Sequence, residues 1–146
     1  MNDQPAPAGP VPAASLGRRL GSLCYEALLL AAILFVAGWI FLAFERLLPA
    51  ALARLLFQLY LLAFTAAYFI YCWTRSGQTL PMKTWRIRVV ARDGTDISVK
   101  RAALRYLFAL ASIAICGGGY WWALVDRDGQ FLHDRLAGTR IIKDEG

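Results

Sequence analysis

Three long apolar runs limit what this chain can fold into more than any other feature of its sequence. They cover about residues 23–44, 51–73 and 102–125, and the last two contain uncharged cores at 55–73 and 106–125. Each run has about 20 residues, the length that a helix needs to cross a hydrocarbon core of about 30 Å. The runs lack the polar face of a small soluble domain and the alternation of barrel strands. The sequence therefore predicts an all-α polytopic membrane protein with about three transmembrane helices.

The composition agrees with this fold class. Of the 146 residues, 58% are hydrophobic and 18% are charged, against about 45–50% and about 25% in ordinary soluble domains. This balance excludes a disordered protein, a collagen-like chain and a disulfide scaffold. The length allows one domain at most. We expect a disordered tail rich in Pro and Ala over residues 1–15 and one membrane domain over residues 16–146.

The polar segment at 74–101, between the second and third runs, is typical of a small β-structure. Residues 85–90 alternate and carry β-branched side chains, an Asp-Gly turn follows, and residues 97–99 can form the returning strand. Residues 139–143 are a third candidate strand. We therefore expect a small β-hairpin or sheet that caps the helices on the cytoplasmic side.

The basic residues predict the orientation of the helices. The segment from Arg75 to Arg101 holds seven Lys or Arg, whereas the first loop holds one, Arg46. Basic loops stay in the cytoplasm. This rule places the N-terminus and the loop 74–101 on the cytoplasmic side of the membrane.

The third run leaves two interpretations open. Gly117, Gly118 and Gly119 interrupt it near its middle, and glycine is poor helix sequence. Either the run is one kinked spanning helix, or it enters the membrane, turns at the glycines and returns. The kinked spanning helix would leave the C-terminus outside the cytoplasm. The tail after the run carries four basic residues, which favours the cytoplasmic side instead. The second needs the interrupted backbone to be covered by protein or water.

Charged side chains near the ends of the runs are the candidate functional residues. Glu26 lies about one turn inside the first run, and Arg19 precedes it by seven residues, which places both on one helix face. A carboxylate at depth needs a partner, water or a proton, and it can bind and release a proton or a cation. Alternatively, Glu26 lies at head-group level near the N-terminus of its helix. Arg54 and Arg105 begin the later runs, where arginines commonly snorkel to the head groups.

Other chemistries have little support. His133 and Asp134 resemble half of a catalytic triad, but no Ser or Cys is placed as their nucleophile. The chain has one His, and its three Cys are spread one to each run, which is typical of small buried side chains rather than metal ligands. The basic loop has anionic lipid as its nearest partner. We therefore expect a protein that is not an enzyme, with no cofactor, no metal and no nucleic-acid partner.

Several motifs together resemble the RDD family of bacterial membrane proteins, over about residues 16–143. They are Arg19 with an acid seven residues later, Gly77-Gln78-Thr79-Leu80, Arg88-Val89-Val90, and Leu132-His133-Asp134-Arg135-Leu136-Ala137-Gly138-Thr139. The arginine and two aspartates that name the family correspond to Arg19, Glu26 and Asp134. This chain departs from the family pattern by its glutamate at position 26, and by Pro81 and Arg86 where many members have glycine.

The resemblance implies a multi-helix inner-membrane protein, and some members of the family are associated with exchange of sodium, lithium or potassium for protons. Two functions follow as expectations. In a small cation/proton antiporter, assembled as an oligomer, Glu26 would bind the proton or monovalent cation, Arg19 would pair with it, and Asp134 would be a second acid or a gate. In a non-transporting scaffold or accessory subunit, held by a membrane partner protein, Arg19, Glu26, Asp134 and Arg105 would form a structural polar cluster.

Overall fold

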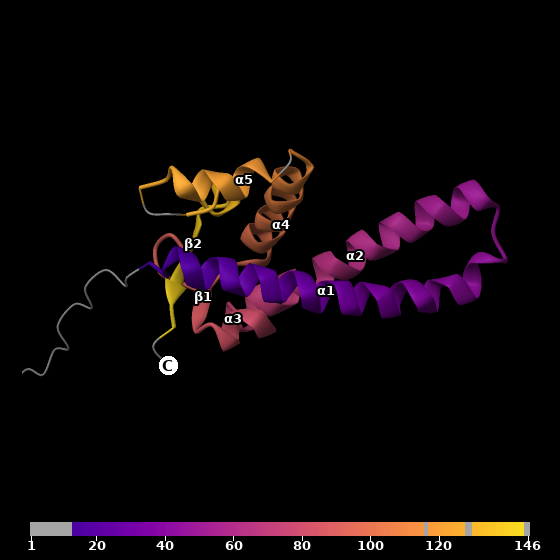
Figure 1. Cartoon of the computed structure of the whole chain (residues 1–146), viewed down its shortest axis with the longest axis horizontal. Coiled ribbons are helices and arrows are strands. Elements are labelled where there is room, and N and C mark those ends of the chain that lie inside the picture. The colour runs from indigo at the N-terminus through magenta and orange to yellow at the C-terminus, as the bar shows by residue number, and fades with distance from the viewer. Residues whose placement is uncertain (1–12, 116, 128–129, 145–146) are drawn as a thin grey trace, which may run out of the picture.

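Two long antiparallel helices dominate the computed structural model, which describes residues 13–115, 117–127 and 130–144. Helix α1 (Leu16–Glu45) and helix α2 (Ala50–Ser76) form a hairpin whose far half projects beyond the rest of the molecule (Figure 1). Pro49 immediately precedes α2 and cannot donate a backbone hydrogen bond, which suits a helix start. Gly77, in the left-handed conformation, ends α2.

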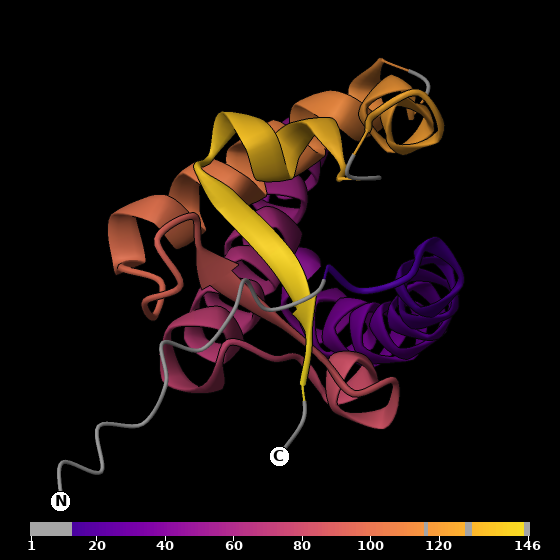
Figure 2. The same cartoon turned by 90° about the vertical axis from the view of Figure 1, so that its left-hand side faces the viewer.

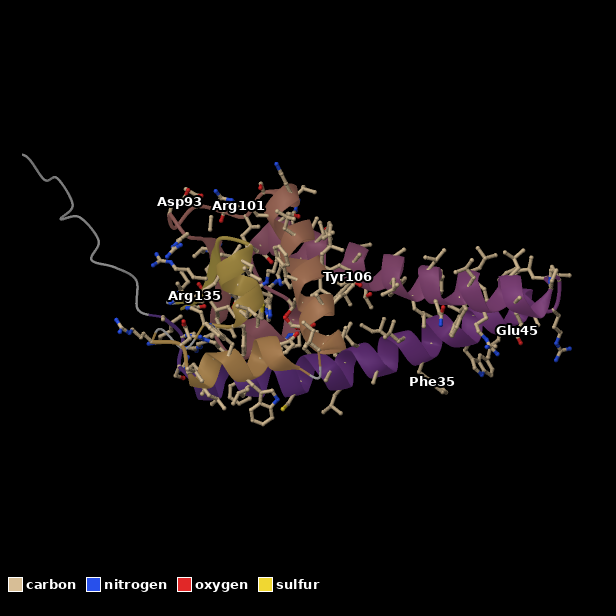
Figure 3. The ribbon with its side chains drawn as sticks, turned by 90° about the horizontal axis from the view of Figure 1, so that it is seen from above. Phe35, Glu45, Asp93, Arg101, Tyr106 and Arg135 are labelled. Carbon is tan, nitrogen blue, oxygen red and sulfur yellow. The ribbon has the colours of Figure 1, made fainter. Side chains whose placement is uncertain are left out.

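The hairpin presents apolar side chains to its surroundings. Phe35, which is 73% exposed, points away from the hairpin, and most side chains of the projecting half end in carbon (Figure 3). Such an apolar surface suits lipid rather than water. Both helices are long and apolar enough to cross a membrane. The predicted membrane protein with a small sheet is confirmed, and the third run supplies a further candidate span only as a bent pair.

The third apolar run is not one straight helix. Helix α4 (Val99–Ala114) ends before the glycines, and α5 (Gly118–Trp121) with the 3₁₀ turn η1 (Trp122–Leu124) follows at 104° to it. Gly117 has a φ of +74°, which a residue with a side chain rarely adopts. After this turn α5 points toward the end of the hairpin where the sheet lies (Figure 1).

A two-stranded antiparallel sheet joins distant parts of the chain. Strand β1 (Ile87–Ala91) pairs with β2 (Thr139–Lys143), and Val89 lies opposite Ile141. These two strands were predicted, but the returning strand at 97–99 is wrong. Ser98 instead caps α4, because its Oγ accepts a hydrogen bond from the backbone N of Arg101.

The residue ahead of α1 also reaches the sheet. Ala13 forms a bridge with Ile142, and the backbone N of Ala14 donates to the carbonyl of Ile141 at 3.2 Å. The predicted tail covers residues 1–15, of which residues 1–12 lie outside the described part of the chain. The start of α1, the loop after α2 and the C-terminal strand therefore meet at one end of the hairpin (Figure 2).

Two short helices complete this end of the molecule. Helix α3 (Leu80–Thr84) connects α2 to β1, and α6 (Leu132–Leu136) precedes β2. We call α3, β1, α4, α5, η1, α6 and β2 the cap. The hydrophobic core lies between the cap and the near ends of α1 and α2, and its largest members are Trp73, Met82, Ile87, Tyr106, Phe131 and Ile141. The core thus holds the cap on the hairpin.

Candidate functional site

A cavity of about 410 Å³ lies between the cap and the hairpin. Its size falls within the range of about 300–1,000 Å³ that is common for small-molecule sites. Most of its lining is apolar, and side chains from α1, α2, α4, α5 and α6 contribute polar groups to it. These polar residues are Arg19, Ser22, Glu26, Thr65, Arg105, Tyr106, Tyr120 and His133.

Glu26 is buried in the wall of this cavity, with 7% of its surface exposed. The hydroxyl of Tyr68 on α2 donates to its Oε1 at 3.0 Å, and the hydroxyl of Thr79 donates to its Oε2. Both donors are neutral, and a carboxylate has about four lone-pair positions. Glu26 therefore keeps acceptor capacity for a proton or a cation.

The motif Gly77-Gln78-Thr79-Leu80 places Thr79 against Glu26. Gly77 reverses the chain in a left-handed conformation, and the backbone N of Val89 donates to its carbonyl at 2.8 Å. The Gln78 amide donates to the carbonyl of Ile87 at 3.0 Å and to Asp144 at 2.8 Å. These bonds fix the turn between α2 and α3. Thr79, completely buried, then lies beside the first helix rather than in the sheet.

Arg19 lies two helical turns before Glu26 and lines the same cavity. It is 2% exposed, and its Nη2 donates to the carbonyl of Ala14. The two hydrogen bonds of the Glu26 carboxylate described above come from Tyr68 and Thr79, and a pairing of Arg19 with Glu26 stays a prediction. Through the carbonyl of Ala14, Arg19 fastens the start of α1 near the sheet.

Arg105 and Asp134 form a buried ion pair in the cap. Nη1 of Arg105 donates to Oδ1 of Asp134 and, at 3.1 Å, to the hydroxyl of Thr139. The guanidinium also lies 4.7 Å from the centre of the Trp73 ring, a cation–π distance. Arg105 is 4% exposed. Snorkelling to the head groups is therefore wrong for Arg105, which joins α4 to α2, α6 and β2.

His133 lies beside this pair as a neutral ring. Its Nε2 is 3.6 Å from Oδ1 of Asp134, and it stacks on Phe131 with the ring planes 15° apart. Burial lowers the pKa of His133 from 6.5 to about 4, because desolvation disfavours the charged imidazolium more than the Asp134 carboxylate favours it. At neutral pH His133 is therefore uncharged.

The four predicted site residues divide into two groups. Arg19, Glu26 and Arg105 line the cavity. Asp134 does not line it but forms an ion pair with Arg105, which does. Sequence reasoning missed Tyr68, Thr79 and Thr139. Thr79 lies in a recognised motif, but nothing in the sequence shows which acid its hydroxyl meets. Tyr68 gave a weak signal as a hydroxyl inside an apolar run.

Metal-binding side chains do not gather at this site. Within the described ranges, no three His, Cys, Asp or Glu residues lie together so that they could hold a metal ion. Cys24 is exposed and Cys72 is half-buried, and both are free thiols. The candidate site is therefore a cavity with one buried carboxylate and two arginines.

Comparison with known proteins places the chain in a family. The chain has no match among curated proteins and none among solved structures. The model of the RDD family matches residues 13–138, which include the whole cavity wall except Ile141. Arg19, Glu26 and Asp134, identified from the sequence as the positions of the family's arginine and two acids, are all buried. Because the match covers most of its length, the chain belongs to the RDD family of membrane proteins.

Proposed function

We propose that this protein is a small cation/proton antiporter of the bacterial inner membrane, and not an enzyme, in which Glu26 binds a proton and a monovalent cation in turn. The observation that supports the proposal is the environment of that carboxylate. It is buried in the wall of a cavity, at the cap end of a helix apolar enough to span, and two neutral hydroxyls hold it. A buried ionisable group in such a helix is a functional-site candidate.

The chemistry of exchange follows from competition for one carboxylate. A deprotonated Glu26 offers oxygen ligands, the kind that hard cations prefer. The hydroxyl oxygens of Tyr68 and Thr79 lie within hydrogen-bond distance and could share a bound ion. A protonated Glu26 has lost the charge that attracts the ion. One proton is therefore released for each monovalent cation bound, and the net charge of the site stays the same.

The two arginines set the electrostatics of the cavity. Arg19 and Arg105 bring positive charge to the lining that holds Glu26. Asp134 compensates Arg105 from behind the wall. We therefore assign Asp134 the role of holding Arg105 in place, rather than that of a second ion-binding acid.

The topology of this proposal follows the basic residues. Every Lys and Arg except Arg46 and Arg54 lies in the cap or in the parts of the chain next to it. The positive-inside rule then places the cap, the loop 74–101 and both termini in the cytoplasm. Two spanning helices enclose little, so the ion path lies between copies in a homo-oligomer or beside a membrane partner protein.

A structural role is the second candidate, and the Arg105–Asp134 pair favours it. The pair is almost completely buried and connects α4, α6 and β2, as expected of a cluster that holds a scaffold together. In this case exchange of the two charges, Arg105→Asp with Asp134→Arg, would restore assembly that either single change abolishes. A double variant no better than the singles would argue against direct pairing as the structural device.

Proteoliposomes with an imposed pH gradient test the transport proposal. Addition of sodium, lithium or potassium should collapse the gradient for the wild type and fail to do so for Glu26→Gln. Glu45→Gln is the matched control, because Glu45 is an acid at the opposite end of the same helix. No cation response from a folded, inserted wild type would overturn exchange, and an unchanged response in Glu26→Gln would remove Glu26 from the path.

A further inference from the structure

The cavity is elongated and changes character along its length. Helix α1 contributes one stripe to it, from Arg19 through Glu26 to Leu34, which spans about 22 Å at the helical rise of about 1.5 Å per residue. The polar residues of the stripe are at the cap end. Beyond Glu26 the wall is mostly apolar, because the two hydroxyls of Thr65 and Tyr106 bond to each other at 2.6 Å. The apolar lining there is formed by Ala27, Leu30, Leu34, Leu61, Leu110 and Ile113.

The apolar end of the cavity reaches the surface of the molecule. Leu62 and Ile113 line the cavity, yet they are 45% and 60% exposed. Around this end the hairpin exposes further apolar side chains, such as Leu28 at 72%, so the surrounding medium is the bilayer. An apolar space of this size that stays empty loses the contacts of its lining atoms. A chain of lipid has both the chemistry and the access to fill it.

The polar end has the opposite charge to an anionic head group. The whole chain has a net charge of +6, and all but two of its Lys and Arg are at the cap end. Arg18, half-buried at the start of α1, donates to the carbonyl of Trp85 at 3.4 Å, and Lys83 on α3 is exposed. Basic residues at the membrane surface attract anionic lipids. The two ends together therefore match an amphiphile with an anionic head and an apolar tail.

We propose that the cavity binds one acyl chain of an anionic phospholipid from the surrounding bilayer, with the head group at the basic cap end. The chain lies along α1 past Leu30 and between Leu61 and Ile113. The lipid seals the side of the cavity that faces the bilayer. Lipid binding does not require ion exchange, because the residues that line the cavity support it by themselves.

Lipid retention in detergent tests the proposal. The full chain is reconstituted in vesicles of equal phosphatidylglycerol and phosphatidylcholine, extracted in a mild detergent and weighed by native mass spectrometry. The wild type should retain phosphatidylglycerol. Leu30→Trp, which fills the cavity, should lose it, and Leu28→Trp, on the exposed face of the same helix, should retain it as the wild type does.

A second pair of variants guards against misfolding of the first. Ile113→Trp fills the cavity from α4, and Leu107→Trp is its control, since Leu107 is 58% exposed and does not line the cavity. The proposal is overturned if no lipid stays with the wild type, if the filled variants retain it, or if phosphatidylcholine is retained equally. A wild-type dimer without lipid that Leu30→Trp converts to monomers would assign the cavity to a second copy. Ion flux is measured in a separate experiment. If the protein exchanges no ions, the lipid result can still be interpreted.

Discussion

The indole of Trp85 packs directly on Gly21, so closely that a Cβ added to this glycine would lie 2.5 Å from Cζ2 of the indole. The contact brings the turn between α3 and β1 against the first helix, five residues before Glu26. Among the described glycines of α1, Gly21 is the one that the cap approaches most closely. The absence of a side chain at Gly21 thus sets the distance between the helix and the cap.

Gly21→Ala should destabilise the protein relative to Gly17→Ala by about 1–3 kcal/mol, because the new methyl group must displace the indole. Gly17 is the matched control, since a Cβ there would meet no atom within 4 Å. Thermal unfolding in detergent micelles measures the difference. Equal midpoints for the two variants would show that Trp85 moves aside without cost.

Asp134→Asn should destabilise the cap by about 3–5 kcal/mol, because it leaves the buried charge of Arg105 without compensation. Asp96→Asn removes the partner of Arg88 from an exposed pair, in which the two side chains are 86% and 34% exposed, and should change stability by about 1 kcal/mol or less. Denaturant titration of both variants supplies the comparison. Similar losses in the two would mean that burial of the Arg105–Asp134 pair does not matter.

Stability should rise with pH between about 4 and 6.5 through His133. In this window the unfolded chain binds a proton on the imidazole, whereas the folded chain, with the pKa lowered to about 4 by burial, does not. The groups that face this ring are Asp134, Arg105, Tyr120 and Phe131. His133→Phe should therefore flatten the pH dependence of the unfolding midpoint, and a slope equal to that of the wild type would contradict the assignment.

Gly77→Ala should cost more stability than Gly94→Ala. Both glycines have positive φ, at +68° and +87°, so both substitutions pay a backbone strain of about 1 kcal/mol. A Cβ on Gly77 would in addition lie 2.8 Å from the carbonyl oxygen of Val89, whereas one on Gly94 would have its nearest neighbour at 3.9 Å. Thermal unfolding separates the two. Gly77→Ala should also weaken any activity that depends on Glu26, because Gly77 positions Thr79.

Both termini should lie on the cytoplasmic side. The pairing of β2 with β1, and of Ala13 with Ile142, brings the two ends and the loop 74–101 to the same end of the hairpin. Reporter fusions at the N-terminus and at the C-terminus should therefore give the same signal, that of the cytoplasm. A periplasmic signal from the C-terminal reporter and a cytoplasmic signal from the N-terminal one would contradict the pairing of β1 with β2, because the two strands would then lie on opposite sides of the membrane.

The sequence predicts the local parts of this fold well. Length and hydropathy predict the two helices of the hairpin, because a run of about 20 apolar residues forms few structures other than a membrane-spanning helix. The alternation over 85–90 and 139–143 predicts two strands. The returning strand at 97–99 is wrong because Ser98 caps a helix. Two β-branched residues on either side of a serine are too short a signal to exclude a helix start.

The sequence predicts the members of the site better than their partners. Arg19, Glu26 and Arg105 are recognisable as charges in or near the apolar runs, and Asp134 follows from the resemblance of the motif at 132–139 to the RDD family. Their partners are far away in the chain: Thr79 is 53 residues from Glu26, and Asp134 is 29 residues from Arg105. A single sequence shows that a buried carboxylate needs a donor, but tertiary packing alone decides which donor meets it.

The strand pairing described above has a consequence for how the protein is made. β1 and the hairpin leave the ribosome first, but the partner of β1 is residues 139–143, about 50 residues later in the sequence. Contacts between residues distant in sequence form late, and here this pairing cannot form before residues 139–143 have been made. Until then Arg105 has no ion pair with Asp134, and the cavity lacks the side chains of α6. The newly inserted hairpin therefore remains open until then, and a chain that stops before residue 139 would have no strand to pair with β1.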